Sequence, residues 1–341
     1  MNRIEKQIVR ALTWKPMSVW ELMNYQDAHV AEYFDHLKNM IEKGIIKQRE
    51  DGKLALTESA PTLKPVIRIR CSSCGGKGID IKGTFFQELY DKFLAEIKDR
   101  PAPEESFDQG FIRTIDTIGR VAFAYERGDL EDTDIFVVGD DDLVGLALAM
   151  TEMPRRVFMV DIDERLVNYE REKAKKLGLN LDASTWDARK ELPSDWKSSF
   201  DVFFTDPPET DKAWKAFLSR AVSGLKGIGS SGYFGFTHRE SSLAKWRRFE
   251  RYLTDMGFAV TDIIRDFNVY PEDQYDEGFW DTWPLWKKLP VKATHTPEDW
   301  YTSSLVRIEA VDEIKPLITG DLELTPEFYY DDESLVTPRV D

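Results

Sequence analysis

Apolar residues near the start of the chain recur every three or four positions, as they do along one face of a helix. The first stripe consists of Ile4, Ile8, Val9 and Leu12. This spacing predicts an N-terminal helix. A second helix is expected over residues 19–24, with Ser18 as its N-cap, and a third over 28–43, ended by Gly44.

A β-hairpin is expected after these helices. Residues 45–48 and 53–57 are short runs with strand character, and Asp51-Gly52 between them is typical of a tight turn. Three helices and a hairpin predict a winged helix-turn-helix domain over residues 1–62. Its third helix, which would read DNA in such a domain, is net acidic, so we interpret the unit as structural or dimerising.

Residues 63–130 are expected to connect this unit to the rest of the chain. Hydrophobic spacing predicts helices over 83–98 and 111–127. The two cysteines of the chain, Cys71 and Cys74, form half of a zinc-ribbon pattern. Because no second Cys pair or nearby His completes four ligands, we interpret them as structural thiols rather than as a metal site.

Strand and helix patterns alternate over residues 131–312. Strands are predicted at 135–139, 156–161, 200–205 and 232–237, and helices at 143–152, 164–177, 212–224 and 242–256. Two more strands, 258–264 and 304–310, would close the sheet as an antiparallel pair. This alternation predicts an α/β fold with a doubly wound, mostly parallel sheet that binds ligands at the carboxyl ends of its strands. Residues 313–341 are expected to form an acidic, mobile tail.

The charge balance limits the partners of the protein. Asp and Glu number 62 against 46 Lys and Arg, which gives a net charge of −16, and residues 71–341 alone carry −19. Such a surface repels nucleic-acid phosphates and attracts polycations. No apolar run approaches the ~18 residues of a membrane span. The N-terminus has no signal-peptide pattern, so we expect a cytoplasmic protein without membrane partners.

Acidic clusters follow the predicted strands at the edge where this fold binds its ligands. The first is Gly139-Asp140-Asp141-Asp142, where nucleotide-binding folds usually carry a glycine-rich turn. Three carboxylates would repel a pyrophosphate, so NAD and ATP are disfavoured and a neutral or cationic ligand fits better. One or two of these acids are also suited to capping the next helix.

Two further clusters suit a nucleoside. Asp161 and Asp163 follow the second predicted strand, at about the offset where an acid accepts hydrogen bonds from ribose hydroxyls, and Asp163 is also a candidate helix N-cap. Asp187 and Ala188 lie in the loop before the next predicted strand. An Asp there is able to accept a hydrogen bond from an adenine amino group.

The fourth cluster is the stiff loop Thr205-Asp206-Pro207-Pro208-Glu209. An adenosyl ligand without phosphates, held among acids, suggests S-adenosylmethionine or a relative. The fold and the Asp-Pro-Pro loop resemble the Rossmann-like class I methyltransferases. Members that act on DNA amino groups carry an aromatic residue after Asp-Pro-Pro, whereas Glu209 would repel nucleic acid and attract an amine.

The complete set of motifs closely resembles the branched-chain polyamine synthases, or N4-bis(aminopropyl)spermidine synthases, of archaea and thermophilic bacteria. The most specific segments are GDDDLVGLAL and FTDPPET, and the resemblance spans nearly the full chain. It implies two successive aminopropyl transfers from decarboxylated S-adenosylmethionine, a co-substrate, to N4 of spermidine. Methylthioadenosine would be the co-product, other linear polyamines are possible acceptors, and neither a bound cofactor nor a metal is expected.

Within that resemblance a carboxylate would take the proton of N4. The catalytic candidates are Asp140, Asp141 and Asp206, with Asp140 as the first choice. The donor nucleoside would be held by Gly139, Asp161, Asp163, Asp187, Ala188, Thr205 and Pro207. The polyamine would be held by Asp142, Glu209, Glu240, Tyr270, Glu272 and Asp273. The last three belong to residues 270–280, where aromatic faces and acids suit alkylammonium groups.

Two alternatives stay open at this point. One is an S-adenosylmethionine-dependent N-methyltransferase acting on nucleic acid or another amine, and the other is a non-enzymatic winged-helix regulator. Glu209 and the acidic charge argue against nucleic acid, and the run of strand-end acids argues against a regulator. The winged helix and the lone Cys pair are also compatible with a homodimer.

Overall fold

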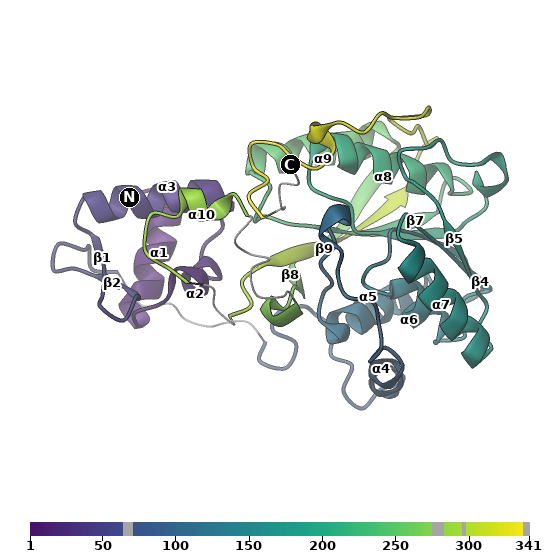
Figure 1. Cartoon of the computed structure of the whole chain (residues 1–341), viewed down its shortest axis with the longest axis horizontal. Coiled ribbons are helices and arrows are strands. Elements are labelled where there is room, and N and C mark those ends of the chain that lie inside the picture. The colour runs from purple at the N-terminus through teal and green to yellow at the C-terminus, as the bar shows by residue number, and fades with distance from the viewer. Residues whose placement is uncertain (64–70, 275–282, 295–297, 337–341) are drawn as a thin grey trace.

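The structure is a computed structural model of the chain and describes residues 1–63, 71–274, 283–294 and 298–336. A small helical unit at the N-terminus lies beside a larger α/β unit (Figure 1). Among the described residues, no helix has both the length and the apolar character needed to cross a membrane.

The N-terminal unit contains the three helices and the hairpin that the sequence predicts. They are α1 (Arg3–Trp14), α2 (Val19–Met23), α3 (Val30–Glu42), β1 (Ile46–Gln48) and β2 (Leu54–Leu56). The N-cap prediction is confirmed, since Ser18 Oγ accepts a hydrogen bond of 2.9 Å from Glu21 N. The two strands pair antiparallel. The assignment of this unit as a winged helix-turn-helix stays a prediction.

Side chains from the C-terminal third of the chain complete the core of this unit. The ring of Trp20 lies 5.2 Å from that of Trp300, centroid to centroid, and Leu335 belongs to the same buried cluster. The short helix α10 (Leu285–Lys288) lies beside α3 in Figure 1 and contacts it. The N-terminal unit therefore shares its core with residues that the hydrophobic pattern does not connect to it.

The larger unit is built on a seven-stranded sheet in the order β5-β4-β3-β6-β7-β9-β8. The strands are β3 (Asp134–Val138), β4 (Arg156–Asp161), β5 (Leu181–Thr185), β6 (Val202–Thr205), β7 (Ser231–Phe236), β8 (Phe258–Val269) and β9 (Thr302–Ala310). The first five in sheet order are parallel, and β9 pairs antiparallel with both β7 and β8. This is the doubly wound, methyltransferase-like Rossmann topology, so the predicted sheet and its closing antiparallel pair are confirmed.

The edge strand β5 is missing from the sequence prediction. It contributes only two buried side chains, Leu181 and Ala183, and its other residues are polar. Such a short, mostly polar run carries no periodic pattern, and its pairing with β4 makes it a strand.

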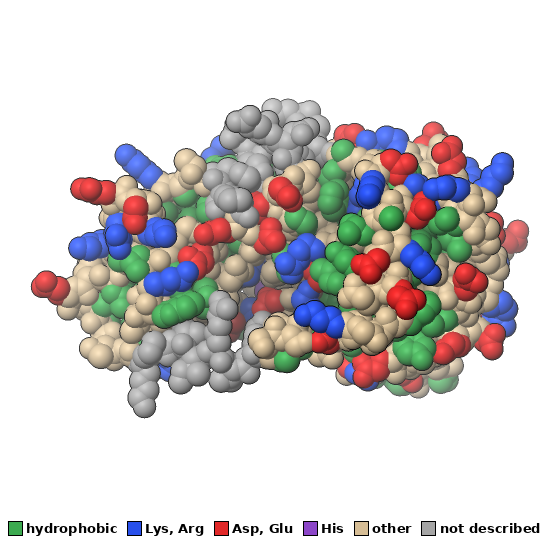
Figure 2. Space-filling view, turned by 90° about the horizontal axis from the view of Figure 1, so that it is seen from below, with side chains coloured by type: hydrophobic (Ala, Val, Ile, Leu, Met, Phe, Trp, Pro, Cys, Tyr) green, Lys and Arg blue, Asp and Glu red, His purple; other side chains and the backbone are tan. Residues whose placement is uncertain are grey.

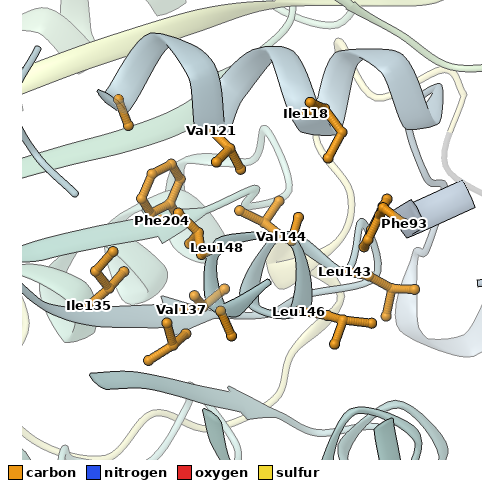
Figure 3. Close-up of a cluster of buried hydrophobic side chains, with 14 of the residues drawn as sticks. Phe93, Ile118, Val121, Ile135, Val137, Leu143, Val144, Leu146, Leu148 and Phe204 are labelled. Carbon is orange, nitrogen blue, oxygen red and sulfur yellow. The ribbon is translucent and has the colours of Figure 1, made fainter. Parts of the chain in front are cut away.

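Helices cover both faces of the sheet. They are α5 (Thr114–Glu126), α6 (Val144–Ala149), α7 (Glu164–Leu177), α8 (Asp211–Ser223) and α9 (Leu243–Asp255), with α4 (Phe85–Glu96) packed outside α5. In Figure 3, Ile118 and Val121 of α5 point toward α6 and toward Phe204 of β6, and these side chains belong to one buried cluster. A second cluster packs α8 and α9 against the other face.

In the described part of the C-terminal tail, residues 313–336, Phe328 and residues 334–336 are buried, whereas residues 313–325 are exposed or half-buried. The mobility of the tail stays a prediction. Phe328 is buried against α8, and Arg220 of α8 donates to the main-chain oxygens of Ile318 and Gly320. Asp331 lies 2.7 Å from the buried Lys245. Apolar residues between the acids, and ion pairs of some of the acids such as Asp331, provide these contacts. Short 3₁₀ helices occur at Glu105–Phe107, Ser194–Trp196, Glu272–Gln274 and Pro326–Phe328.

Candidate active site

A deep pocket of about 1430 Å³, counted with its solvent-open space, lies at the carboxyl ends of β3, β4, β6 and β7. The predicted site residues that line it are Gly139, Asp140, Asp141, Asp161, Asp187, Ala188, Asp206, Pro207, Glu209, Glu240, Tyr270 and Glu272. Acidic side chains are visible in the hollow between the two parts of the molecule in Figure 2. The expectation that the strand-end clusters meet at one edge is therefore confirmed.

Four predicted site residues do not line the pocket. Thr205 Oγ1 donates a hydrogen bond of 2.6 Å to the main-chain oxygen of Val138. Asp163 caps α7 by accepting from Arg165 N at 2.9 Å, and it also pairs with the Arg165 side chain. Both residues hold the ends of strands and helices in place, which explains their position without a ligand.

Asp142 and Asp273 are the other two. Asp142 accepts a hydrogen bond of 2.7 Å from Ile112 N and lies 3.0 Å from the guanidinium of Arg120. Asp273 is exposed beside the pocket. The sequence alone does not reveal that Asp140 and Asp141 line the pocket whereas Asp142 does not, because consecutive residues of the loop point in different directions.

Asp140 is fully engaged by the start of α6. Its two carboxylate oxygens accept hydrogen bonds of 2.6 Å from Val144 N and Gly145 N. Glu170 of α7 is fully buried, and burial together with the charge of Asp140 raises the pKa of Glu170 well above its usual range. Leu143, just before the helix, has a left-handed backbone with φ of 56°, a costly conformation that its packing must hold. The carboxylate of Asp140 therefore anchors the loop.

Asp141 lines the pocket. Its Oδ2 accepts a hydrogen bond of 2.9 Å from Gly110 N, and among the described residues no donor lies within hydrogen-bond distance of Oδ1. Burial, and after it the charge of Asp206, raises the pKa of Asp141 to about 7. A carboxyl group with a pKa near neutrality is suited to accepting and releasing a proton.

Asp206 is held by a buried cation that sequence inspection misses. Arg120 of α5 lies 2.7 Å from Asp206 Oδ2, and Tyr270 donates its hydroxyl to the same oxygen at 3.2 Å. Asp206 also lies directly on β7, where a Cβ at Gly235 would come within 2.0 Å of Oδ1. This glycine is therefore required for the close approach of the carboxylate to the strand.

Carboxyl groups gather at one end of the pocket, which we call the amine end and define by Glu209, Glu240, Glu272, Tyr270 and Tyr301. Glu209 accepts a hydrogen bond of 3.1 Å from Thr237 N, and Tyr301 donates to Glu240 at 2.8 Å. Burial raises the pKa of Glu209 well above its usual range and that of Glu272 to about 9. These groups are suited to a cation, whose arrival would offset the cost of ionising them.

The opposite end of the pocket, the nucleoside end, consists of Asp161, Trp186, Asp187, Ala188 and Tyr329. The two oxygens of Asp161 accept from Asp140 N and Asp163 N, each at 2.8 Å. Asp187 is paired with the guanidinium of Arg189 at 2.6 Å. Trp186, in the loop after β5, and Tyr329, in the tail, complete this end. Because Arg189 already pairs with Asp187, this end has less need of a cationic ligand than the amine end.

Several pocket residues carry no sequence pattern that reveals them. They are Phe107, Asp108, Gln109, Gly110, Phe217, Trp283, Tyr301, Phe328, Tyr329 and Val336, together with the supporting Arg100 and Arg120. They come from connecting loops, helix faces and the tail, so only the fold brings them to the strand ends. Residues 275–280 of the predicted aromatic and acidic segment lie outside the described residues.

Comparison with known proteins identifies the family of the chain. Residues 88–336 match the sequence family described as "Branched-chain polyamine synthase A C-terminal domain". The chain is 42% identical over 270 residues to N(4)-bis(aminopropyl)spermidine synthase of Methanocaldococcus jannaschii, covering 78% of this chain and 75% of the relative. The chain belongs to the branched-chain polyamine synthase A family.

Relatives from Thermus thermophilus extend the match over the N-terminal part. The N(4)-bis(aminopropyl)spermidine synthase of that organism is 36% identical over 309 residues, 89% of this chain and 87% of the relative. A crystal structure of the branched-chain polyamine synthase from Thermus thermophilus, in complex with N4-aminopropylspermidine and 5'-methylthioadenosine, has a TM-score of 0.87 and 34% identity. It covers 98% of this chain and 93% of the other. The family fold therefore includes the N-terminal unit.

Proposed function

We propose that the protein transfers the aminopropyl group of decarboxylated S-adenosylmethionine to N4 of spermidine, first to N4-aminopropylspermidine and then to N4-bis(aminopropyl)spermidine. The co-product is methylthioadenosine. The observation that carries this proposal is that one pocket contains both the nucleoside end and a cluster of buried carboxyl groups. Family membership supports it, since the Thermus thermophilus relative was crystallised with N4-aminopropylspermidine and 5'-methylthioadenosine.

The nucleoside end suits the adenosyl part of the donor. Asp161 and Asp187 are the acceptors for ribose hydroxyls and the adenine amino group, with Gly139, Ala188 and Pro207 forming the walls. Decarboxylated S-adenosylmethionine carries no carboxylate of its own, so the acidic pocket favours it over the ordinary methyl donor. The pocket lining does not support ligand roles for Asp163 and Thr205.

The amine end suits the terminal ammonium groups of the acceptor. Glu209, Glu240 and Glu272 supply charge, and Tyr270 and Tyr301 supply aromatic faces for the alkyl chain. When the terminal ammonium groups are bound in this way, N4 is held beside the donor carbon, so the reaction does not depend on a chance encounter. Asp142 and Asp273 are not part of this proposal, because neither lines the pocket.

Asp141 is the base in this proposal, in place of Asp140. The N4 ammonium gives a proton to Asp141, and the freed lone pair attacks the aminopropyl carbon bonded to sulfur. That carbon–sulfur bond breaks, and its electron pair stays on sulfur, which leaves as neutral methylthioadenosine. Asp140 is less suited, since both of its oxygens accept from α6 amides, and the ion pair with Arg120 occupies Asp206.

The two transfers differ in their proton balance. After the first attack, the tertiary ammonium must lose another proton before N4 can attack again. After the second attack, the nitrogen carries four carbon substituents and has no proton to lose. Each proton taken up by Asp141 passes to solvent before the next transfer. The permanent positive charge of the final product is then stabilised by the carboxylates that line the pocket.

The proposal includes expectations about partners. Nucleic acid is not a substrate, the N-terminal winged helix is structural, and a homodimer is the expected assembly. The alternative N-methyltransferase would need an aromatic stacking residue where Glu209 lies against Thr237. Passage through a heparin column at moderate salt separates the polyamine enzyme from a nucleic-acid binder, which would be retained.

A product mass spectrum tests the function. The protein is incubated with spermidine and either decarboxylated or ordinary S-adenosylmethionine. Mass gains of one and then two aminopropyl units with the decarboxylated donor alone are expected, and fragmentation locates the new groups at N4. A gain of one methyl group with the ordinary donor would instead establish a methyltransferase, and no product from either donor would refute the enzymatic proposal.

A further inference from the structure

Arg239, two residues beyond Thr237 at the end of β7, joins the N-terminal unit to the α/β unit. Its side chain is 2% exposed. The guanidinium donates to the main-chain oxygen of Met23 at 2.9 Å and to Asn24 Oδ1 at 3.1 Å. The main-chain oxygen of Arg239 accepts a hydrogen bond of 2.8 Å from Val30 N, at the start of α3. Both the side chain and the main chain of Arg239 therefore bond to the N-terminal unit.

The same guanidinium also holds the segment that leads into β9. Its Nε donates to the main-chain oxygen of Trp300 at 3.1 Å, and the Trp300 ring packs against Trp20 of α2. Asn24 adds a second link, because its side-chain amide donates to the main-chain oxygen of Asp299 at 3.2 Å. A buried guanidinium must have its N–H groups bonded, so this arrangement has little freedom to shift.

The next residue along the chain from each anchor belongs to the amine end of the pocket. Glu240 follows Arg239, and Tyr301 follows Trp300. These two pocket residues are bonded to each other, with the Tyr301 hydroxyl donating to Glu240 Oε2 at 2.8 Å. A displacement of Arg239 or Trp300 would therefore shift the adjacent pocket residue, Glu240 or Tyr301.

We propose that the N-terminal unit is a positioning element for the amine end, and that Asn24 and Arg239 set the placement of Glu240 and Tyr301 and so the affinity for an alkylammonium group. Asn24 and Arg239 are positioning residues, since neither lines the pocket. The identity of the amine rests on the proposed function, but the coupling between the N-terminal unit and the amine end does not. The unit's helices thereby serve the pocket rather than a nucleic acid.

The main test is Asn24→Ala, which removes an acceptor of Arg239 and the link to Asp299 without touching the pocket. The exposed Asn24 side chain can be truncated without opening the core. We expect spermidine to bind roughly 3–10-fold more weakly, the range for one or two lost hydrogen bonds. Methylthioadenosine binding, measured by the same titration calorimetry, should stay within about twofold. Asn39→Ala, at an exposed position of α3, is the matched control and should change neither ligand.

A second pair of variants tests the guanidinium itself. Arg239→Met should weaken spermidine binding more than Asn24→Ala does, because it removes every side-chain hydrogen bond of Arg239 and leaves only main-chain bonds such as that from Val30 N. Arg307→Met is its control: Arg307 is similarly buried and pairs with Asp129 at 2.9 Å, but it does not line the pocket. Arg307→Met should lower the melting temperature without a selective effect on spermidine.

The outcomes separate this inference from the proposed function. Selective loss of spermidine affinity in Asn24→Ala supports the coupling, and unchanged spermidine affinity in folded Asn24→Ala overturns it. Equal weakening of both ligands also overturns it, since that is general destabilisation. If Arg239→Met does not fold, Asn24→Ala decides alone. Binding is measured without turnover, so a wild-type protein that binds spermidine but transfers nothing would refute the function while still testing the coupling.

Discussion

The two ends of the pocket hold their acids in different ways. At the nucleoside end, Asp187 pairs with an arginine, and Asp161 accepts two backbone N–H groups that partly offset the rise of its pKa by burial. At the amine end, Glu209 and Glu240 lie near each other, and burial raises the pKa of both. The number of acids therefore does not identify a cation site. What distinguishes it is whether the protein supplies the compensating positive charge.

Asp141 lies between the two ends, and removing its carboxylate should have the largest effect. Asp141→Asn is expected to lower kcat by about 10²–10⁴, the usual contribution of a general base. Methylthioadenosine should still bind, because the nucleoside end is intact. Product formation followed by mass spectrometry measures the loss, and Asp182→Asn, an exposed position on β5, is the control. A small loss in Asp141→Asn would assign the base elsewhere.

Lowering the pH should have the second-largest effect on activity, after Asp141→Asn. The pKa of Asp141 is raised to about 7, so its basic form is lost below neutrality. We expect kcat/KM for spermidine to fall about tenfold per pH unit below pH 7. A flat profile between pH 5 and 7 would contradict a base with this pKa.

The raised pKa values of the buried acids should also make the folded protein more stable at lower pH, where activity falls. Burial raises the pKa of Asp141 to about 7 and that of Asp142 to about 8, so the folded protein holds more protons than the unfolded chain between about pH 4 and 8. The contribution of these acids to the free energy of unfolding therefore decreases as pH rises through that window. Saturating spermidine should reduce this decrease, as melting curves with and without it would reveal.

A pair of substitutions separates the two ends directly. Glu209→Gln should raise KM for spermidine about 10–100-fold, as expected for one charged hydrogen bond, with little change in methylthioadenosine affinity. Asp187→Asn should weaken methylthioadenosine by a smaller factor, about 2–10-fold, and leave spermidine unchanged. Steady-state kinetics and calorimetry measure both. Equal effects of either variant on both ligands would remove the distinction between the ends.

Proton release on binding is the smallest expected effect. Glu209, Glu240 and Glu272 have raised pKa values in the empty pocket, and a nearby ammonium would lower them. Spermidine binding at neutral pH should therefore release a fraction of a proton or more, while methylthioadenosine binding should release almost none. Calorimetry in two buffers of different ionisation enthalpy measures the number. Equal release by both ligands would contradict the comparison.

The sequence was sufficient to predict most of the fold and the location of the site. The apolar runs of β3, β4, β6 and β7 and the acids after them place the pocket, because parallel strands end at one edge. The roles of the individual acids could not be predicted from the sequence. Whether Asp140, Asp141 or Asp142 faces the pocket depends on Leu143 adopting a left-handed backbone and on Arg120 arriving from another helix.

The parts that sequence analysis missed have one physical cause. β5 becomes a strand through pairing with β4, and Phe328 and Val336 reach the pocket only because the tail packs on α8 and beside Glu240. These are contacts between residues far apart along the chain, which no local pattern encodes. The motif GDDDLVGLAL located the site because its own strand, turn and helix are local.

The docking of Arg239 also has a consequence for how the chain reaches its native state. The anchor joins residues 23 and 24 to residue 300, and Val336 N donates to Glu240 at 2.9 Å. Contacts over such separations form late, since loop closure opposes them. During synthesis the N-terminal helices must wait for almost the whole chain to emerge before their shared core closes. A chain that lacks residues 300–336 therefore lacks the contacts of Tyr301 and Val336 with Glu240, which are part of the amine end.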